Sequence, residues 1–553
     1  MDFLSHVFKS MSSKKKFLNN LVSSFYPFLI WTPLRNLFLN KSSADSLDII
    51  INDPWSGNSE EGYKILKGFL TVSGETISFN ESLWKSKSAS QIWIEELHSF
   101  SWIKDLRSVG SNQARIFFRK CILNWMDLFS GWSRTIWRSD ILGKRVCFLL
   151  GSYNFFCSSA DEIFQKKLIK NISVQVSHLV RYKLRDVKGF NRIFAIKGII
   201  LGSISFSKLN KNIDYGISLL IEEIRNQVFS DGSHYLKSPS KHLEFLKNLI
   251  DIKFFLSRSK TIPPQELNET IDKMASILKS YRHGDGTLST FNDSKPIDKI
   301  TIDQILLRAN SKLKINNTSN LTGIHKIAEN KMNFLMDAGN PVLENTFAGS
   351  LSFEFSFGKH IIVVNSGSPH IYNERWAEAM RSTAAHSTLM IDNVNSSDII
   401  FDKEKNSRIA KVWSNKVYDG KSYLIESAHD GYKKIFGLIH NRKIHINCHE
   451  RILRGHDLIS RVTKNFKSIP KEFYIRFHIH PDVEANITSS RKKVILKLKD
   501  GQGWEFICSD SIISIGESVY LAKKNQMIRN THILLRDKVL PDKKIKWLFR
   551  LLQ

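Results

Sequence analysis

The sequence predicts a multidomain α+β protein in which a helical block comes first and a block of antiparallel strands follows. From about residue 90 to 310, apolar residues recur at intervals of three and four, the spacing of one face of an amphipathic helix. Near residue 325 the interval changes to two, the spacing of a strand with one buried face. The length agrees with this division, because a chain of 553 residues is too long for one compact core and two or three domains are expected.

About seven amphipathic segments follow one another in the first block. They are "ASQIWIEELHSFSWIKDLR", "NQARIFFRKCILNWMDLFS", "DEIFQKKLIKNISVQVSHLVRYKL", "GFNRIFAIKGIILGSISF", "IDYGISLLIEEIRNQVF", "SKHLEFLKNLIDIKFFLSR" and "QELNETIDKMASILKSYRH". Short breaks containing Gly, Ser or Asn join them, and Pro263-Pro264 marks the start of the last one. Such a series predicts a bundle, a solenoid or an α/α toroid, and periodicity alone does not choose among these.

The second block consists of alternating stretches rich in β-branched and aromatic residues. They are "LSFEFSFGKHIIVVNSG", "AHSTLMIDN", "IFGLIHNRKIHINCHERIL", "EFYIRFHIHPDVEANIT", "RKKVILKLKDGQGWEFICSD" and "GESVYLAKKNQMIRNTHILLR". Turns of Gly, Asn and Asp separate them, with no helical pattern in between. Many antiparallel strands without intervening helices predict a β-sandwich.

The charge balance predicts an anionic partner. The net charge is +28, from 81 Lys and Arg against 53 Asp and Glu. Nucleic acid, an anionic membrane surface and an acidic polysaccharide all fit, and compositional drift toward Lys, Asn, Ile and Ser explains the excess equally well. Because neither a basic tail nor a zinc-finger spacing appears, we expect no specific nucleic-acid partner. The five cysteines form no CxxC pair, which argues against a disulfide framework and against a cysteine-ligated metal.

The first 45 residues form a separate N-terminal segment in this interpretation. Three lysines at 14–16 precede "FLNNLVSSFYPFLIWTPL", which has no charge before Arg35. The pattern resembles the basic and apolar regions of an export signal or of a membrane-associating segment. Its Asn, Ser and Pro content and the lack of a small-residue cleavage site favour a leading helix packed on the first domain instead.

Two loops in the helical block contain residues capable of proton transfer. In "SDGSHYLKSPSKHLEFL", His234 and Tyr235 lie between a turn and the start of the next helix. In "YRHGDGTLSTFNDS", Tyr281 and His283 stand at a helix end before a Gly-rich turn. Loops between helices are where a groove finds its polar residues. Each loop taken alone is equally compatible with an ordinary solvated connection.

Two further groups of polar residues lie in the strand block. In "RSTAAHSTLMIDN", His386 leads into a short strand, and Asp398 and Asp402 follow beyond it. A histidine with nearby carboxylates and a further histidine could ligate a divalent metal. In "AHDGYKKIFGLIHNRKIHI", Tyr432 occupies a turn and His440 begins the next strand. Histidines on a sheet face, such as the pair in "RFHIHP", are more often structural than ligands.

Taken together, and in the order in which they follow along the chain, these stretches resemble the heparinase II/III family of polysaccharide lyases. The similarity is carried by "DGSHYLKSPSKHLEFLKNLID", "RHGDGTLSTFNDS", "SFEFSFGKHIIVVNSGSP", "RSTAAHSTLMID", "AHDGYKKIFGLIHNRKI" and "RFHIHPDVEA". The resemblance implies an incomplete α/α toroid at residues 46–315 and a heparinase II/III-like β-sandwich at 316–553. It also implies cleavage of a uronate-containing polysaccharide by β-elimination.

That reaction needs a group that neutralises the uronate carboxylate, a base that takes the C5 proton and an acid that protonates the leaving oxygen. The resemblance assigns catalytic roles to His234 and Tyr432 and, less directly, to Tyr281, with Tyr235 as the alternative tyrosine. His386 matches either a catalytic histidine or a metal ligand, and the sequence does not separate these roles. The residues expected to bind substrate are Ser233, Tyr235, Lys237 and His283.

The resemblance implies a divalent metal, commonly zinc in relatives, in the sandwich domain. His386, one of Asp398 and Asp402, and His440 match that pattern best. The chain also departs from the family. Ser233 stands where some relatives have Asn, and Lys237 stands where some have an acidic residue. Because a lysine can itself bind a uronate carboxylate, we expect these changes to alter the substrate rather than abolish activity.

Three classes of function follow from these observations. We expect a lyase acting on an acidic polysaccharide of an envelope or capsule, with a non-catalytic glycan-binding or envelope-assembly protein on the same scaffold as the alternative. Nucleic-acid binding through the basic surface is the third class. The substrate argues for the cell envelope or periplasm, whereas the weak export pattern leaves the cytoplasm open.

Overall fold

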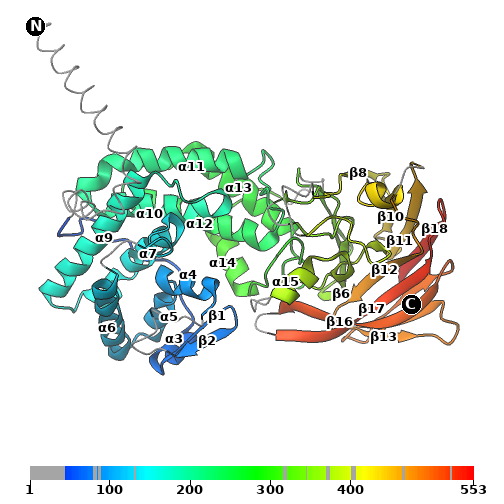
Figure 1. The fold of residues 1–553 in the computed structure, drawn as a ribbon, viewed down its shortest axis with the longest axis horizontal. Coiled ribbons are helices and arrows are strands. Elements are labelled where there is room, and N and C mark those ends of the chain that lie inside the picture. Colours follow the sequence, from blue (N-terminus) through cyan, green and yellow to red (C-terminus); the bar gives the residue numbers. More distant parts are fainter. Residues whose placement is uncertain are drawn as a thin grey trace, which may run out of the picture. The chain divides into compact units, whose positions relative to one another are not determined.

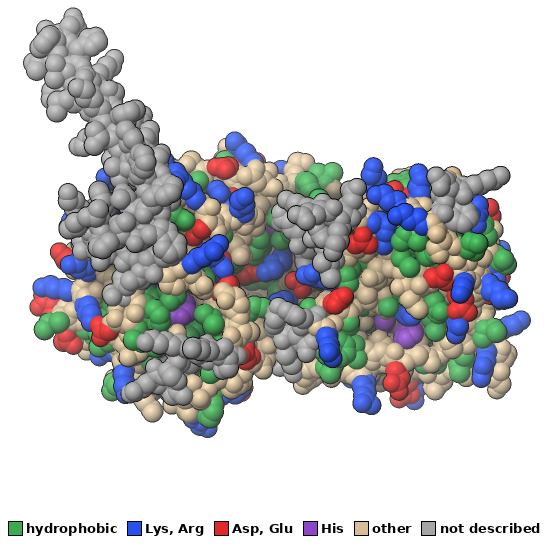
Figure 2. Space-filling view, in the orientation of Figure 1, with side chains coloured by type: hydrophobic (Ala, Val, Ile, Leu, Met, Phe, Trp, Pro, Cys, Tyr) green, Lys and Arg blue, Asp and Glu red, His purple; other side chains and the backbone are tan. Residues whose placement is uncertain are grey.

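The computed structural model describes residues 44–78, 84, 89–129, 133–314, 321–343, 346–368, 374–399, 407–463, 467–523 and 526–552. The N-terminal segment predicted for residues 1–45 therefore lies almost entirely outside the described residues. Within the described ranges, no helix is long and apolar enough to cross a membrane. In the view of Figure 2, Lys and Arg side chains are spread over the visible face with acidic side chains among them.

Helices make up the first part of the chain (Figure 1), as the sequence predicts. They are α3 (Ser59–Leu66), α4 (Gln91–Ser99), α5 (Ile103–Val109), α6 (Asn112–Leu128), α7 (Ser139–Gly151), α8 (Tyr153–Cys157), α9 (Glu162–Tyr182), α10 (Arg192–Ser205), α11 (Ile213–Gln227), α12 (Pro239–Arg258), α13 (Gln265–Ser280) and α14 (Lys299–Ala309). One small hairpin, β1 (Phe69–Val72) with β2 (Glu75–Ser78), interrupts this series.

The helix bounds follow from local capping. Asp161 accepts a hydrogen bond from the Phe164 N–H and begins α9. The stretch "ASQIWIEELHSFSWIKDLR" is predicted as one helix but forms two, because Phe100 adopts a left-handed conformation (φ 58°) that ends α4 before α5 begins. Glycines bring α7 and α10 together: a Cβ on Gly198 would meet the Cα of Gly143 at 2.6 Å.

The chain divides into two compact units. One contains Met1–Gln227 with Asn248–Asn268, and the other contains Val228–Lys247 with Glu269–Gln553. The second unit thus includes the strand block and also the two polar loops, around His234 and around Tyr281, that follow α11 and α13. The domain bounds 46–315 and 316–553 stay predictions, because the units are defined by compactness alone.

Strands make up the remainder of the second unit. They are β3 (Ile324–Glu329), β4 (Met332–Asp337), β5 (Phe353–Phe357), β6 (His360–Val364), β7 (Leu389–Ile391), β8 (Val412–Tyr418), β9 (Tyr423–His429), β10 (Leu438–Asn447), β11 (Ile452–Arg461), β12 (Glu472–Ile479), β13 (Glu484–Ile487), β14 (Lys493–Lys497), β15 (Gly503–Cys508), β16 (Ile512–Lys523), β17 (Gln526–Lys538) and β18 (Lys544–Leu551). Two short helices, α15 (Glu374–Arg381) and α16 (Lys433–Phe436), lie among them.

The strands form two antiparallel sheets. The first sheet has the order β16-β17-β12-β6-β5-β4-β3, with β7 beside β12, and the second has the order β13-β14-β15-β18-β11-β10-β9-β8. One apolar core lies between them: the ring of Phe353 in β5 stacks on Trp547 in β18 at 5.6 Å, and Phe355 meets the ring of Trp504 at 5.1 Å. Two antiparallel sheets that share one core form the predicted β-sandwich.

Two strand predictions differ in detail from the structure. The stretch "GESVYLAKKNQMIRNTHILLR" contributes to two strands, β16 and β17, that pair antiparallel with each other (Figure 1). The strand after His386 is only three residues long, Leu389–Ile391, and His386 itself caps a short 3-10 helix over Thr383–Ala385. His386 therefore stands before the strand rather than in it.

Candidate functional site

His234 is fully buried in the loop before α12. Its backbone pairs with Val228 in an isolated antiparallel bridge, and its ring lies 5.0 Å from that of Phe245. The Nδ1 atom accepts a hydrogen bond from the Leu236 N–H at 3.2 Å, so the proton of a neutral ring is on Nε2. Burial, together with His242 and Lys241, holds the pKa of His234 well below its usual range. This imidazole is neutral at physiological pH.

Ser233 and Lys237, predicted to bind substrate, already have protein partners. The Ser233 hydroxyl donates to Asp231 at 2.6 Å. Lys237 has a left-handed backbone (φ 56°), and its ammonium donates to the carbonyl of Asn340 at 2.6 Å. Burial lowers the pKa of Lys237, while the Asp337 carboxylate acts in the opposite direction. Tyr235, whose ring lies 5.1 Å from that of His234, is half-buried in the same loop.

Tyr281 directly follows α13 and its side chain is buried. Its ring meets that of His242 edge-on at 5.4 Å. His242 lies in the first turn of α12, where its Nε2 donates to the Met274 carbonyl at 2.8 Å. Charge interaction between His242 and His234 is strong enough to lower the pKa of the latter. The structure thus groups His234 and Tyr281 around His242, which the sequence analysis missed although it stands in the quoted "SPSKH".

His283 forms a buried ion pair with a residue that the sequence analysis also missed. Its Nε2 lies 2.7 Å from Oε2 of Glu354, in the middle of β5, and its Nδ1 lies 3.2 Å from the Ser356 hydroxyl. The sequence signal that could have identified Glu354 is its position as the single glutamate inside the aromatic stretch "SFEFSF". Hydrogen bonds and charge from His283 and hydrogen bonds from Thr290 outweigh burial, so the pKa of Glu354 is lowered.

The Glu354 carboxylate also connects to the segment that carries His386. Its Oε1 accepts hydrogen bonds from Thr290 and, at 3.1 Å, from the Asn365 amide. The Asn365 side-chain oxygen in turn accepts from the N–H of Ser387 at 2.9 Å. One hydrogen-bonded chain therefore joins His283 to the residue next to His386.

A hydrogen bond at Nδ1 selects the tautomer of the His386 ring. Its Nδ1 lies 2.8 Å from the carbonyl oxygen of Ser382. A carbonyl can only accept, so Nδ1 carries the proton and Nε2 has the lone pair. The hydrogen bond that the His386 ring makes to the described residues is the one at Nδ1. Burial lowers the pKa of His386 to about 4, against the Ser382 carbonyl and Glu354, so the ring is neutral near pH 7.

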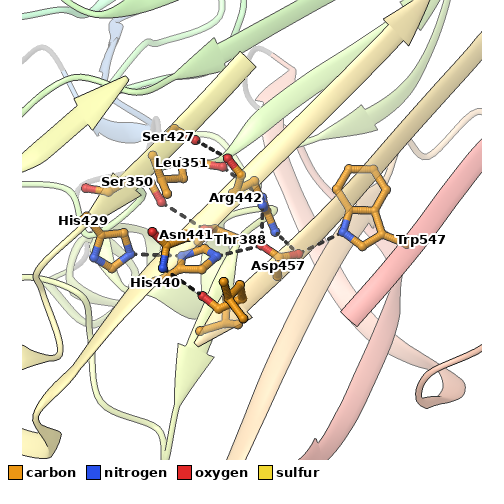
Figure 3. A network of polar contacts seen from close by, with 12 residues as sticks. Ser350, Leu351, Thr388, Ser427, His429, His440, Asn441, Arg442, Asp457 and Trp547 are labelled. Atoms are coloured by element: carbon orange, nitrogen blue, oxygen red, sulfur yellow. Dashed lines mark hydrogen bonds and ion pairs between the residues drawn. The ribbon is translucent and has the colours of Figure 1, made fainter. Parts of the chain in front are cut away.

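Tyr432 and His440 belong to a different neighbourhood, inside the sandwich. The Tyr432 side chain is completely buried, its hydroxyl donates to the Leu389 carbonyl at 3.0 Å, and burial raises its pKa. Figure 3 shows His440 in a buried network of β9, β10, β11 and β18. The catalytic role expected for Tyr432 stays a prediction.

Both ring nitrogens of His440 have partners in this network (Figure 3). Nε2 donates to Asp457 Oδ1 at 2.7 Å, and Nδ1 accepts from Nε2 of His429 at 3.2 Å. His429 Nδ1 accepts from the Gly431 N–H, and this bond fixes the donor and acceptor of each hydrogen bond from His429 through His440 to Asp457. Arg442 completes the charge balance of the Asp457 carboxylate with contacts at 2.7 and 3.1 Å.

The residues in place do not fit the expected metal set at His440. A ligating imidazole needs a free lone pair, and both His440 nitrogens are engaged. Asp398 pairs with Arg408 at 3.0 Å, and Asp402 lies outside the described residues. No group of three or more His, Cys, Asp or Glu suited to a metal occurs in the described part of the chain. The divalent metal stays a prediction, and we derive no chemical step through it.

Comparison with known proteins places this geometry in context. Residues 87–316 match the family model "Heparinase II/III N-terminus", and residues 317–548 match "Heparinase II/III-like, C-terminal". The chain is 25% identical over 524 residues to FtsZ-localized protein C of Caulobacter vibrioides, covering 90% of this chain and 88% of that protein. It is 23% identical over 241 residues to heparin-sulfate lyase of Pedobacter heparinus, covering 40% and 35%.

Solved structures confirm the fold. A crystal structure of heparinase III covers 97% of this chain and 91% of its own, with a TM-score of 0.72 and 13% identity. A mutant of heparan sulfate lyase HepC from Pedobacter heparinus covers 94% and 88%, with a TM-score of 0.64 and 17% identity. Of the three helical architectures that the periodicity left open, this similarity selects the incomplete α/α toroid, followed by an antiparallel β-sandwich.

Proposed function

Because the chain belongs to the heparinase II/III family, we propose that it is a lyase that cleaves a uronate-containing polysaccharide by β-elimination, with His386 as the base. The observation that carries the proposal is the His386 tautomer. The Ser382 carbonyl accepts from Nδ1–H, which leaves the lone pair of the neutral ring on Nε2. A histidine with this arrangement accepts a proton at Nε2 without first breaking a hydrogen bond.

His386 Nε2 takes the C5 proton of the uronate, the electron pair forms the C4–C5 double bond, and the C4–O bond breaks. The leaving oxygen receives a proton from an acid, the role expected for Tyr281. His386 becomes a cation, which the nearby Glu354 carboxylate favours because that carboxylate already raises the His386 pKa.

The partner that we propose is an acidic polysaccharide of the cell envelope. The net charge of +28 favours a polyanion. A relative that matches 90% of this chain carries the name FtsZ-localized protein C, which supports an envelope-associated role. Residues 87–548, which the two family models cover, contain every proposed catalytic residue.

The test measures turnover directly. The purified chain is incubated with a panel of acidic polysaccharides, and ultraviolet absorbance of the new C4–C5 double bond is followed. We expect one polymer to give a rising signal that His386→Gln reduces by roughly 10²–10⁴-fold. The matched control is His325→Gln, since His325 is also a buried histidine of this unit and its Nε2 bonds to the Ser414 hydroxyl at 2.9 Å. Equal activity of His386→Gln and the unmodified chain would overturn the assignment of the base.

A second candidate function is a non-catalytic glycan-binding or envelope-assembly protein on the same scaffold. One observation favours it: FtsZ-localized protein C is similar over nearly the whole chain, whereas the named lyase matches only 40% of it. Glycan binding without any absorbance change on the panel, in the unmodified chain, would select this function over the lyase.

A further inference from the structure

Beside His386, the second unit contains a pocket of about 740 Å³. None of its lining residues transfers a proton in the elimination proposed above. Its floor comes from β12, β16 and β17 and includes Arg476, Asn530 and His532, together with the charged residues Glu517 and Arg529. Its opposite wall is the segment from α15 to His386, which contributes Ala379, Met380, Ser382, Ala384 and Ala385. Ala385 immediately precedes the proposed base.

Arg476 is a largely buried guanidinium that forms no ion pair with the described residues. Its Nη1 atom is buried and has no hydrogen-bond partner among the described residues. Burial lowers the pKa of Arg476, and only the phenol groups of Tyr474 and Tyr432, among described residues, favour its charged form. A buried charge without a partner costs several kcal/mol, and a guanidinium does not avoid this cost by losing its proton. An anion in the pocket would remove the cost.

Further unpartnered polar atoms line the same pocket. Asn530 donates through its amide nitrogen to the Ile479 carbonyl at 2.7 Å, and its buried oxygen has no hydrogen-bond partner in the described ranges. His532 Nδ1 is likewise buried without a partner, and burial lowers the pKa of this ring to about 4. Gly516 makes room for the ring, since a Cβ there would meet His532 Cε1 at 2.7 Å. An acceptor amide and a neutral imidazole are suited to sugar hydroxyls.

Contacts within the protein hold the walls of the pocket in place without a ligand. His478 spans it, with Nε2 donating to the Ala384 carbonyl at 3.0 Å and Nδ1 accepting from the Ser518 hydroxyl at 2.8 Å. Met380 and Ala385 pack against Leu521, so apolar contacts also hold the wall against β16. These contacts fix the position of the Arg476 floor relative to the His386 segment, which reduces the ordering cost of binding.

We propose that this pocket binds an acidic sugar unit, with the Arg476 guanidinium paired to its carboxylate or sulfate and with Asn530 and His532 at its hydroxyls. The proposal rests on the proposed function for the class of ligand and deepens it, because it places an anionic group of the glycan next to His386. Arginine suits the role, since its planar fork donates two parallel hydrogen bonds to a carboxylate or sulfate. The volume of about 740 Å³ accommodates one or two sugar units.

Binding, rather than turnover, tests this inference. Affinity is measured by calorimetry for a sulfate-free polyuronate and for a sulfated, uronate-containing glycosaminoglycan, in a His386→Gln background that prevents cleavage. We expect Arg476→Gln to weaken binding at least about tenfold, since it removes charge-assisted hydrogen bonds. A loss on both polymers assigns the pocket to a carboxylate, and a loss confined to the sulfated polymer assigns it to a sulfate.

The matched control is Arg536→Gln. Arg536 lies on the neighbouring strand β17, where its guanidinium pairs with Glu472 at 2.8 Å, and it does not line the pocket. We expect this variant to bind within about twofold of the background. Equal losses in both variants, or no loss in Arg476→Gln, would overturn the proposal. If Arg476→Gln does not fold, His532→Gln takes its place with an expected loss of about threefold or more, and unchanged affinity counts against the pocket.

The two proposals fail separately. Absent turnover in the unmodified chain with Arg476-dependent glycan binding rejects the lyase and keeps the pocket. Turnover that depends on His386, together with glycan binding that does not depend on Arg476, keeps the lyase and rejects the pocket.

Discussion

His440 Nε2 lies 2.7 Å from Asp457 Oδ1, in a part of the sandwich where neither side chain reaches solvent. Arg442 shares the same carboxylate at 2.7 Å, and the Trp547 indole donates to its second oxygen at 2.9 Å. Arg442 also donates to the carbonyls of Leu351 and Ser387, both at 2.9 Å. The ion pair of the second sheet thereby supports the backbone at Leu351 and at Ser387, the residue that follows His386.

Asp457→Asn should destabilise the fold strongly. The amide removes the negative charge and points an N–H at one of three donors, His440, Arg442 or Trp547. Breaking a buried pair by changing one partner costs about 3–5 kcal/mol in the free energy of unfolding. Urea unfolding followed by tryptophan fluorescence measures the change.

The control for that measurement is Asp537→Asn, in a partly exposed pair with Lys543. An exposed ion pair contributes about 0–1 kcal/mol. A loss at Asp457 no larger than the loss at Asp537 would mean that the buried network does not stabilise the sandwich.

Metal removal should leave stability unchanged. His440 uses both nitrogens in protein contacts, and Asp398 pairs with Arg408. Treatment with a chelator is therefore expected to leave the thermal midpoint where it was. Elemental analysis of the untreated protein accompanies the measurement. A stoichiometric metal together with a lowered midpoint after chelation would instead favour the predicted set of His386, Asp398 or Asp402, and His440.

The order of the two blocks could be predicted because hydrophobic period reports directly on helix and strand. The loop positions of His234 and Tyr281 also followed from the sequence, since turn residues and helix-start signals mark them. Glu354 and His242 could not be found this way. Glu354 is one polar residue in an aromatic stretch, and His242 is one of several polar residues at the start of α12. The role of each depends on a partner far along the chain, His283 or Tyr281.

The tautomer of His386 was equally beyond the sequence. Its meaning comes from the Ser382 carbonyl, four residues earlier, and that contact exists only because the chain turns in a 3-10 helix at Thr383–Ala385. The pattern "AAHST" predicts a strand, not this turn. Short-range backbone geometry decides which nitrogen of the ring is left free.

Gly349→Ala should lower turnover while leaving the fold intact. A Cβ at this position would lie 2.5 Å from Cδ2 and 2.9 Å from Nε2 of His386, so the ring has to move. A displacement near 1 Å at a reacting group costs roughly 10²-fold in rate. Gly503→Ala is the control, because its Cβ would meet only the flexible Leu552 side chain, at 3.1 Å. Undiminished activity of Gly349→Ala would show that the position of the His386 ring is not limiting.

Lys326 makes stability depend on pH on the alkaline side. Its side chain is buried in β3, where its ammonium donates to the carbonyl of Arg282 at 2.8 Å and to Asn333. Burial lowers its pKa from 10.5 to about 7. Between these values the unfolded chain holds a proton that the folded chain has released, so the free energy of unfolding rises with pH. The cost of burying the charge is fully present below about pH 7 and disappears as the pH approaches the unfolded value.

We therefore expect Lys326→Met to remove a slope of up to about 1.4 kcal/mol per pH unit. The free energy of unfolding in urea, compared between variant and unmodified chain from about pH 6 to pH 9, measures this difference. Lys497→Met, at an exposed position of β14, should leave the slope as it was because its side chain remains in water in both states. The Arg282 carbonyl keeps a donor in Lys326→Met, since Asn333 also reaches it at 3.0 Å. A pH profile of Lys326→Met parallel to that of the unmodified chain would place the proton release on another group.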